Sequence, residues 1–499
     1  MTSSGPDLPQ LPREDAYRFR HLLIRDAAYD SLPKATRADL HRDFAAWLEE
    51  QGQSLVELDE ILGYHLERAC RYRAELGLRV GDELRASARR HLADAGRRAL
   101  SREDLIAAAQ LLRRALALVP EHELDVPLTI DLADTLIYVG KGEEGDRLLG
   151  VLAGQAAALG DPVGEICSRL AQGLLRSQLD PHGPQGSVQE LVGLSEEVEP
   201  VLEAAEDHYA LYLLHEAREQ MAGTMGRRDT QLVELEQAAY HAHLAGLTHL
   251  AQRLVRFEGG ARYFGSTPLT ELLSWLEERE SEHGRNWRLT HWQAVTLGML
   301  GRFDEARPIM AEFLQILEAH GDLVNVGQYR STLATTLELL AGDPVAAVRN
   351  GEEGCRLLEE AGERAFLSTG CTELAEALYV LDRLDEAEAW AWKGLRLGDS
   401  DDLWTQAQSR QVQAKVLARR GQHADAEALA REAVALADTT DGLAGQGHTR
   451  ADLAEVLELA GRRDEATAIL REALDLYERK EALVRARRVR ERLAALEPA

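Results

Sequence analysis

A short phrase that recurs about every 40 residues is the feature that most constrains the fold of this chain. It reads Gly-Arg-Phe-Asp-Glu-Ala at residues 301–306, and close copies occupy residues 382–387 and 461–466. Weaker copies begin at Gly342 and Gly421, so the five starts are separated by 41, 40, 39 and 40 residues. So steady a period indicates a repeat array, in which each unit is expected to pack only on its neighbours.

Composition narrows the fold class and the range of partners. Hydrophobic residues make up 45% of the 499 residues and aromatic residues only 5%, and Ala, Leu, Arg and Glu are the abundant types. Because these residues favour helices, the sequence predicts an all-α protein. The formal net charge of −28 makes a general affinity for nucleic acid or for an anionic membrane unexpected, since the long-range field repels both.

Cysteines and the N-terminal residues bear on the compartment. The four cysteines lie far apart without a C-x-x-C pair, so we predict reduced thiols buried in helices. The first 13 residues are polar and Pro-rich, and no run of 18 apolar residues occurs. We therefore expect a cytoplasmic location.

Each part of the repeated phrase has a structural role in a pair of helices, A and B. In the last copy, Gly461 allows the chain to leave helix A, and Asp464 meets the free N–H groups at the start of helix B. A small residue then lets helix B approach its own helix A closely. This residue is Ala306, Ala347, Ala387, Ala426 or Ala466 in the five copies.

The pattern resembles the tetratricopeptide repeat. The small residue that this family places in helix A recurs as Ala294, Thr335, Ala375, Ala414 and Ala454, with Thr335 as the exception. The period of about 40, against 34 in the family, indicates helices about a turn longer. The resemblance implies a right-handed α-solenoid of helix pairs that binds ligands along the concave face lined by the A helices.

A second resemblance involves the N-terminal region. Residues 17–34 (YRFRHLLIRDAAYDSLPK), 37–41 and 63–68 are similar to the segment that follows the NTPase core in large bacterial signal-transducing ATPases of the adenylate/guanylate cyclase-associated type. The chain has no G-x-x-x-x-G-K-[ST] phosphate loop, Walker B strand or cyclase metal-binding pair. The resemblance therefore implies the C-terminal sensor half of such a protein, without its NTPase and cyclase domains.

These patterns predict the following organisation. Residues 1–15 form a disordered leader, 16–80 a short helical, winged-helix-like module, 81–490 a solenoid of about ten helix pairs, and 491–499 a tail. An irregular stretch is expected near 161–205, because residues 180–186 hold the densest turn cluster in the chain. Ser101 is expected to cap the helix that follows it.

No catalytic, metal or cofactor site is predicted, and we do not expect an enzyme. Carboxylate pairs occur throughout a chain with 85 acidic residues, and no pair stands out from the others as a general acid and base. His241, His243 and His249 lack the spacing of helical zinc ligands.

The candidate binding residues are those that the repeat pattern places on the concave face of the A helices. They are Arg288, His291, Tyr329, Thr332, Thr336, Thr369, Thr372, Glu376, Gln408, Gln411, Lys415, His448 and Glu455. Most of them are polar, whereas the other faces of the same helices are apolar. Such a surface suits an extended peptide or a charged effector. The alternative is that it is simply the solvent-exposed side of a solenoid, which would be polar without binding any ligand.

The predicted function is a non-catalytic protein-interaction or effector-sensing scaffold in bacterial signalling. It would act by binding a protein segment or a polar effector and changing the curvature of the superhelix. One alternative is the regulatory half of an ATPase or nucleotide cyclase that acts on a separate catalytic chain. The third is a transcription regulator that uses the N-terminal module, but the acidic field opposes DNA binding.

Overall fold

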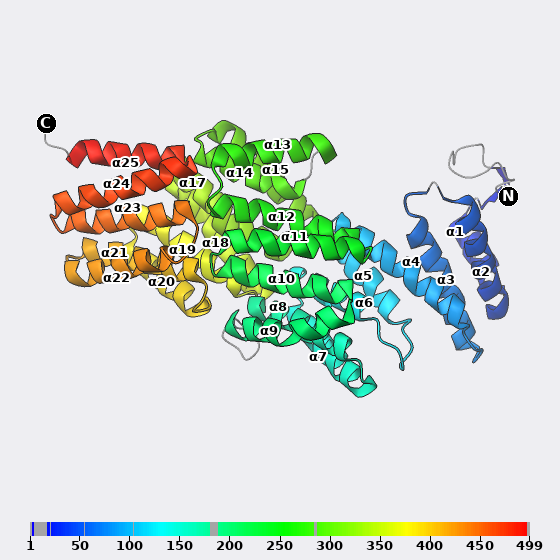
Figure 1. Ribbon diagram of the computed structural model, residues 1–499. Coiled ribbons are helices and arrows are strands. Elements are labelled where there is room, and N and C mark those ends of the chain that lie inside the picture. Colours follow the sequence, from blue (N-terminus) through cyan, green and yellow to red (C-terminus); the bar gives the residue numbers. More distant parts are fainter. Residues whose placement is uncertain are drawn as a thin grey trace. The chain divides into compact units, whose positions relative to one another are not determined.

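A computed structural model describes residues 2–3, 17–19, 21–53, 55–102, 104–179, 188–283 and 287–496 of the chain. These residues are helical almost throughout, and consecutive helices run antiparallel (Figure 1). They divide into two compact units, Met1–Thr135 and Leu136–Ala499. Among the described residues, no helix is long and apolar enough to cross a membrane.

The first unit is built from antiparallel helices of 9 to 20 residues. Its elements are β1 (Thr2–Ser3), β2 (Tyr17–Arg18), α1 (Leu22–Asp30), α2 (Lys34–Gln51), α3 (Leu58–Glu75), α4 (Asp82–Ser101), α5 (Leu105–Leu116) and the start of α6 (Val126–Tyr138). The two strands pair antiparallel. Leu48, Leu62 and Leu66 lie in the core between α2 and α3. The predicted leader at 1–15 falls almost wholly outside the described residues, and the boundary at 80 stays a prediction.

The second unit is built of helix pairs. Its helices are α7 (Gly142–Leu159), α8 (Pro162–Leu179), α9 (Val188–Ala205), α10 (His208–Thr224), α11 (Arg228–Leu244), α12 (Thr248–Phe264), α13 (Leu269–His283), α14 (Trp287–Met299), α15 (Phe303–His320), α16 (Leu323–Tyr329), the π-helical turn η1 (Arg330–Ala334), α17 (Thr335–Ala341), α18 (Pro344–Ala361), α19 (Ala365–Val380), α20 (Leu384–Leu397), α21 (Leu403–Arg419), α22 (His423–Ala437), α23 (Leu443–Leu459), α24 (Arg463–Lys480) and α25 (Leu483–Leu496). The A helices are α8, α10, α12, α14, α16–η1–α17, α19, α21 and α23, and each precedes its B helix. The predicted all-α solenoid is confirmed.

The repeat alanines lie where the sequence predicts them. The five in the B helices are fully buried, and so are the small residues of the A helices, Thr335 included. Thr335 differs from the alanines because its hydroxyl donates to the carbonyl of Arg330 at 2.9 Å, across the π-helical turn. The four cysteines are also buried as free thiols, as predicted.

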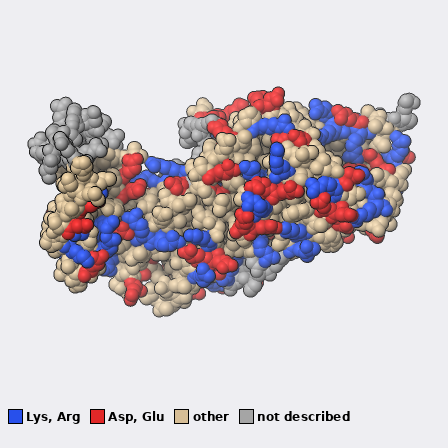
Figure 2. Space-filling view, turned by 180° about the vertical axis from the view of Figure 1, so that it is seen from behind, with Lys and Arg blue, Asp and Glu red and all other residues tan. Residues whose placement is uncertain are grey.

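The turns between A and B helices use the left-handed backbone region. Gly301 and Gly461 have φ of 86° and 78°, and Asp382 takes the same place with φ of 61°. The arginine after this residue pairs with the phrase's glutamate three residues on, as Arg302 does with Glu305. The same ion pair forms in the copies at 383–386 and 462–465. Charges of both signs are accordingly interspersed on the face of the protein in Figure 2.

Two local predictions are wrong. Ser101 is the last residue of α4 and donates to the carbonyl of Arg97, and the next helix is capped instead by Asp104, which accepts from the N–H of Ala107 at 3.0 Å. The stretch near 161–205 is not irregular, since α8 and α9 fill most of it. In α8, Ile166 and Leu170 follow helical spacing and are buried. The predicted loop at 180–186 lies outside the described residues.

Distant parts of the second unit are joined by a regular set of hydrogen bonds, which we call the inter-turn contacts. In each, a carboxylate from the loop after a B helix accepts from a backbone N–H at the start of an earlier B helix. The pairs are Val188 N–Asp399 Oδ2 (3.3 Å), Asp229 N–Asp441 Oδ2 (2.9 Å) and Thr270 N–Glu481 Oε2 (2.9 Å), at sequence separations of 211, 212 and 211 residues. The constant separation means that the solenoid returns on itself after about five helix pairs.

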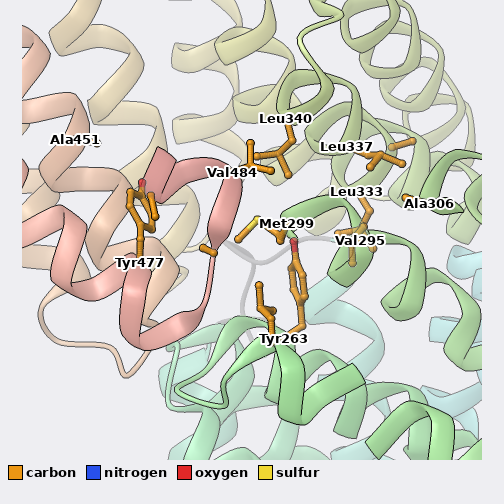
Figure 3. Packing of buried hydrophobic residues seen from close by; sticks show 14 of the residues in the cluster. Tyr263, Val295, Met299, Ala306, Leu333, Leu337, Leu340, Ala451, Tyr477 and Val484 are labelled. Carbon is orange, nitrogen blue, oxygen red and sulfur yellow. The ribbon is translucent and has the colours of Figure 1, made fainter. Parts of the chain in front are cut away.

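Side-chain packing reinforces this return. Lys480 is fully buried, and its ammonium donates to the carbonyl oxygens of Arg262, in the last turn of α12, and of Gly265 and Thr267, which follow that helix. Figure 3 shows Val484 close to Leu340, in a cluster whose residues come from α12 to α17 and from α21 to α25. The expectation that each repeat packs only on its neighbours is therefore wrong for this unit, because successive superhelical turns also touch.

Candidate functional site

The sequence-predicted binding residues all lie on A helices of the second unit. Arg288 and His291 lie on α14, Tyr329 on α16, Thr332 on η1 and Thr336 on α17. Thr369, Thr372 and Glu376 lie on α19, Gln408, Gln411 and Lys415 on α21, and His448 and Glu455 on α23. The side chain of Arg288 lies outside the described part of the chain. Of the other twelve, nine belong to a network of hydrogen bonds and charge interactions that links α17, α19, α21, α23 and α25, and three do not.

Lys415 is the centre of this network. Its ammonium lies 2.7 and 2.6 Å from the two carboxylate oxygens of Glu376 and 3.2 Å from Oδ2 of Asp452. Gln411, one turn earlier on α21, donates through Nε2 to the same Asp452 oxygen at 3.0 Å. Three consecutive A helices, α19, α21 and α23, are thus linked through one buried lysine.

Hydroxyl and amide groups extend the network along α19. Thr372 donates to Oε1 of Gln408 at 2.5 Å, and Thr336 donates to Oε2 of Glu373 at 3.0 Å. The hydroxyl of Thr369 lies 3.0 Å from that of Thr405. These bonds connect α17 to α19 and α19 to α21.

The network ends at α23 and α25. Tyr379 donates its phenol hydrogen to Oε1 of Glu455 at 2.5 Å, and its ring lies 4.8 Å from the ammonium of Lys415. Arg485 of α25 reaches Nδ1 of His448 at 3.0 Å. We call the twelve residues of α17, α19, α21, α23 and α25 that meet here the inner polar cluster. They are Thr336, Thr372, Glu373, Glu376, Tyr379, Gln408, Gln411, Lys415, His448, Asp452, Glu455 and Arg485.

Three predicted residues have other surroundings. His291 stacks against Phe313 and Tyr329, with ring centroids 4.6 and 4.5 Å apart, and neither ring nitrogen has a hydrogen-bond partner among the described residues. Burial lowers the pKa of His291 well below its ordinary value, so the ring is neutral. Thr332 donates to the carbonyl of Gln328, one turn earlier on the same helix. His291 and Tyr329 therefore belong to the apolar packing around α14 to α16.

Exposure in the inner polar cluster differs from the open, wet surface that the sequence suggests. Lys415 and Gln411 are 1% exposed and Thr372 is 0% exposed, whereas Thr336 and Glu455 remain half-buried. The reason is the tight superhelix, which brings the inner faces of successive A helices into contact. Polar residues on this face therefore bond to one another, and only part of the cluster meets solvent.

Burial controls the protonation of the charged groups. It raises the pKa of Glu373 and of Asp452, in the second case against the opposing effect of Lys415. Burial alone would lower the pKa of Lys415, but Asp452, Glu376 and Glu455 together raise it above its ordinary value. Burial also lowers the pKa of His448 well below its ordinary value. The cluster thus holds a charged lysine and a neutral histidine.

The sequence-based selection missed four members of the cluster. Glu373 and Tyr379 flank Glu376 at spacings of three on α19, and Asp452 lies four residues after His448 on α23. These helical spacings could have pointed to all three, because residues three or four apart share a helix face. Arg485 could not be found in this way, since α25 follows the last pair. Among the described residues, no group of three or more His, Cys, Asp or Glu side chains is arranged to hold a metal ion.

Comparison with known proteins agrees with this architecture. Residues 447–481, which cover most of α23 and α24, match the family described as Tetratricopeptide repeat. The α23–α24 pair is therefore similar to a tetratricopeptide repeat in sequence. The crystal structure of the APC/C hetero-tetramer Cut9–Hcn1 is similar over 95% of this chain and 94% of that chain, at 11% identity and a TM-score of 0.50. This similarity supports an α-solenoid of tetratricopeptide-like pairs.

Other solved structures are more distantly similar to this tetratricopeptide-like solenoid. A Rap protein complexed with competence and sporulation factor covers 74% of this chain and 97% of its own, at 10% identity and a TM-score of 0.38. The human IFIT1 dimer with PPP-AAAA covers 93% and 95%, at 15% identity and a TM-score of 0.39. A search of curated proteins finds no match.

Proposed function

We propose that this chain is a non-catalytic, cytoplasmic scaffold that binds a protein segment or a polar effector on the inner face of its A helices. The observation that carries the proposal is the inner polar cluster, in which side chains from five helices converge. The partly exposed members, such as Glu376 and Glu455, give a ligand access to groups that extend across the cluster.

Energetics favour a role beyond holding the helices together. A buried ion pair is often no more stabilising than well-packed apolar residues of the same volume. The repeats are already held by apolar seams, in which Ala414, Leu453 and Leu470 are at most 2% exposed. A cluster with Lys415 at its centre adds little to such packing, so its polar groups are better explained by recognition.

The mechanism follows from how the cluster joins the repeats. Lys415 bonds to carboxylates on the helices before and after its own, so a ligand that competes for Glu376 or Asp452 changes the rotation between neighbouring pairs. The superhelix would transmit this change along its length. Small-angle scattering at saturating ligand should show a change in the radius of gyration, and unchanged dimensions would argue against this step.

Affinity capture from the native cell extract, followed by hydrogen exchange on the complex, tests the proposal itself. We expect a captured partner to protect amides of α17, α19, α21 and α23 more than those of the B helices. A Glu455→Gln variant should capture less of the partner than wild type, while Glu359→Gln, which removes a surface carboxylate of the B helix α18, should not. Protection confined to B helices would place the binding surface elsewhere and overturn the proposal.

A second candidate is a signalling role in which the chain regulates a separately encoded bacterial ATPase or nucleotide cyclase. It is favoured by the N-terminal resemblance together with the first helix, α1, where Leu22, Leu23 and Ile24 are 68%, 82% and 56% exposed. An adjacent reading frame with a phosphate loop and cyclase motifs would supply the partner. Failure of that purified partner to bind wild-type protein more tightly than Leu23→Asp would remove this candidate.

A further inference from the structure

We propose that the inner polar cluster recognises a cationic group of its ligand, either a primary ammonium or a guanidinium. The inference rests on the proposed function, because it takes the inner face of the A helices as the binding surface and names the chemistry bound there. It concerns the region around Glu376, Gln411, Asp452 and Glu455.

The cluster contains more acidic than basic groups. Its carboxylates are Glu373, Glu376, Asp452 and Glu455, and its cations are Lys415 and Arg485. His448 adds no charge, because burial lowers its pKa well below the ordinary value. Four carboxylates therefore face two cations.

Two further arginines approach the cluster but are engaged elsewhere. Arg419 pairs with Asp382 at 2.6 Å, and Arg492 pairs with Glu458 at 2.7 Å. Arg492 also lowers the pKa of Asp452, so the acidic excess is offset only in part. A cation brought by a ligand would offset the rest.

A buried acceptor without a donor points to the same kind of ligand. Gln411 is 1% exposed, and its amide nitrogen donates to Asp452, which fixes the side chain within the cluster. Its Oε1 accepts no hydrogen bond from any described residue. An unsatisfied buried acceptor costs about 1–3 kcal/mol. The partner that this oxygen lacks is an N–H or O–H donor, and ammonium and guanidinium groups both supply one.

Lys415 shows how the cluster holds a cation. Its ammonium contacts both oxygens of Glu376 and one of Asp452, and it lies 4.8 Å from the ring of Tyr379. This is a carboxylate and aromatic environment that suits cations in general. Glu455 provides a further carboxylate on the same helix face as Asp452, and it is half-buried, so a ligand group can reach it.

Protonation gives the proposal a second readout. Burial raises the pKa of Glu373 and of Asp452, so the free cluster tends to take up protons as the pH falls. A bound cation favours the ionised carboxylates and opposes that uptake. Binding is therefore expected to weaken with falling pH.

The test is calorimetric titration of the full chain with four probes. Three are acetylated, amidated pentapeptides that differ only in a central Arg, Gln or Glu, and the fourth is agmatine, a small molecule with a guanidinium and an ammonium group. We expect the Arg peptide or agmatine to bind at least tenfold more tightly than the Gln and Glu peptides. Binding of the Arg peptide but not of agmatine would identify a cation carried by a peptide. Binding of agmatine but not of the Arg peptide would identify a small free cation.

Matched variants locate the binding. Glu455→Gln removes a carboxylate but can still accept from Tyr379, and it should weaken binding of the cationic probe at least tenfold. Glu458→Gln, one turn away and paired with Arg492, should change it less than twofold. Gln411→Leu removes the unpaired acceptor and provides a second variant if Glu455→Gln alters the helical circular dichroism.

Three results would overturn the inference: no binding of either cationic probe at millimolar concentration, tighter binding of the Glu peptide, or equal losses in the two glutamate variants. Tighter binding of the Glu peptide with a loss in Gln411→Leu would leave the proposed function standing, with ligands of the opposite charge. The proposed function fails separately, if a captured partner protects only B helices.

Discussion

Replacing Lys415 by methionine removes the ammonium at the centre of the inner polar cluster while keeping nearly the same side-chain volume. The ammonium lies 2.7 and 2.6 Å from the oxygens of Glu376 and 3.2 Å from Asp452, and the side chain is 1% exposed. At such separations one charge pair contributes roughly 5 kcal/mol at an effective dielectric constant of about 20. Removing one partner of a buried pair costs about 3–5 kcal/mol, because the remaining charge is left uncompensated. We expect Lys415→Met to lose that amount of unfolding free energy at pH 8.

The loss should depend on pH. Burial raises the pKa of Asp452, so its ionised form already destabilises the folded state, and this effect grows when Lys415 is absent. As the pH falls toward the raised pKa, the folded state binds more protons than the unfolded state, and folding is favoured again. The deficit of Lys415→Met should therefore be smaller at pH 5 than at pH 8.

Urea titrations of wild type and variants at the two pH values measure both effects. Lys393→Met is the control, because Lys393 pairs with Glu359 at the surface with a side chain 32% exposed, and such pairs contribute about 0–1 kcal/mol. A loss in Lys415→Met no larger than in Lys393→Met would refute the reasoning. So would a deficit that grows as the pH falls.

Three other predictions follow from the turns, the buried acids and the inter-turn contacts. Gly461→Ala should lower the unfolding free energy by about 1 kcal/mol, because φ is 78° and the cost is backbone strain alone, since an added Cβ meets no atom within 4 Å. Asp382→Gly, at φ of 61°, should raise the unfolding free energy. Urea titrations in which both variants change it with the same sign would contradict this reasoning. Glu219 is 3% exposed, and burial raises its pKa to about 7, so its contribution to stability should fall as the pH rises from about 4.5 to 7. Glu219→Gln should remove that pH dependence and should be more stable than wild type at pH 8 by up to about 3 kcal/mol. The measurement is the shift in urea midpoint between pH 5 and pH 8, and a shift as large as in wild type would contradict the role of Glu219. The double variant Asp441→Ala, Glu481→Ala should lose about 1 kcal/mol of unfolding free energy for each lost helix cap. Its radius of gyration in small-angle scattering should increase. Wild-type stability and size would show that the inter-turn contacts do not hold the superhelical turns together.

The pairwise architecture could be predicted from the sequence because its determinants are local. The glycine that ends helix A and the alanine that follows it, such as Gly461 and Ala466, act within a few residues of each other. Their 40-residue spacing is visible without any structure, and Ala466 is fully buried as expected. Over residues 162–179 the same local reasoning failed, because an irregular stretch was expected there and α8 was missed.

The surroundings of the candidate site could not be predicted, because they depend on the superhelix. The sequence correctly indicates that Thr372, Gln408 and Lys415 are polar residues on one face of the A helices. Whether solvent reaches that face depends on the small rotation between one helix pair and the next, accumulated over about five pairs. The residue types alone do not indicate this accumulated rotation. The burial of Lys415 and the contact of Arg485 with His448 are therefore seen only in the structure.

The inter-turn contacts also bear on how the second unit folds. In an array with contacts only between neighbours, folding can begin at any repeat and spread, and the loss of a terminal repeat costs only its own share. Here Asp441 must find Asp229 across 212 residues, so a contact between distant segments has to form after many local ones. Such long closures slow folding and couple the two ends of the array. A fragment that lacks α24 and α25 would leave Thr270 without its carboxylate partner, so shortening the chain at one end loosens helices near its middle.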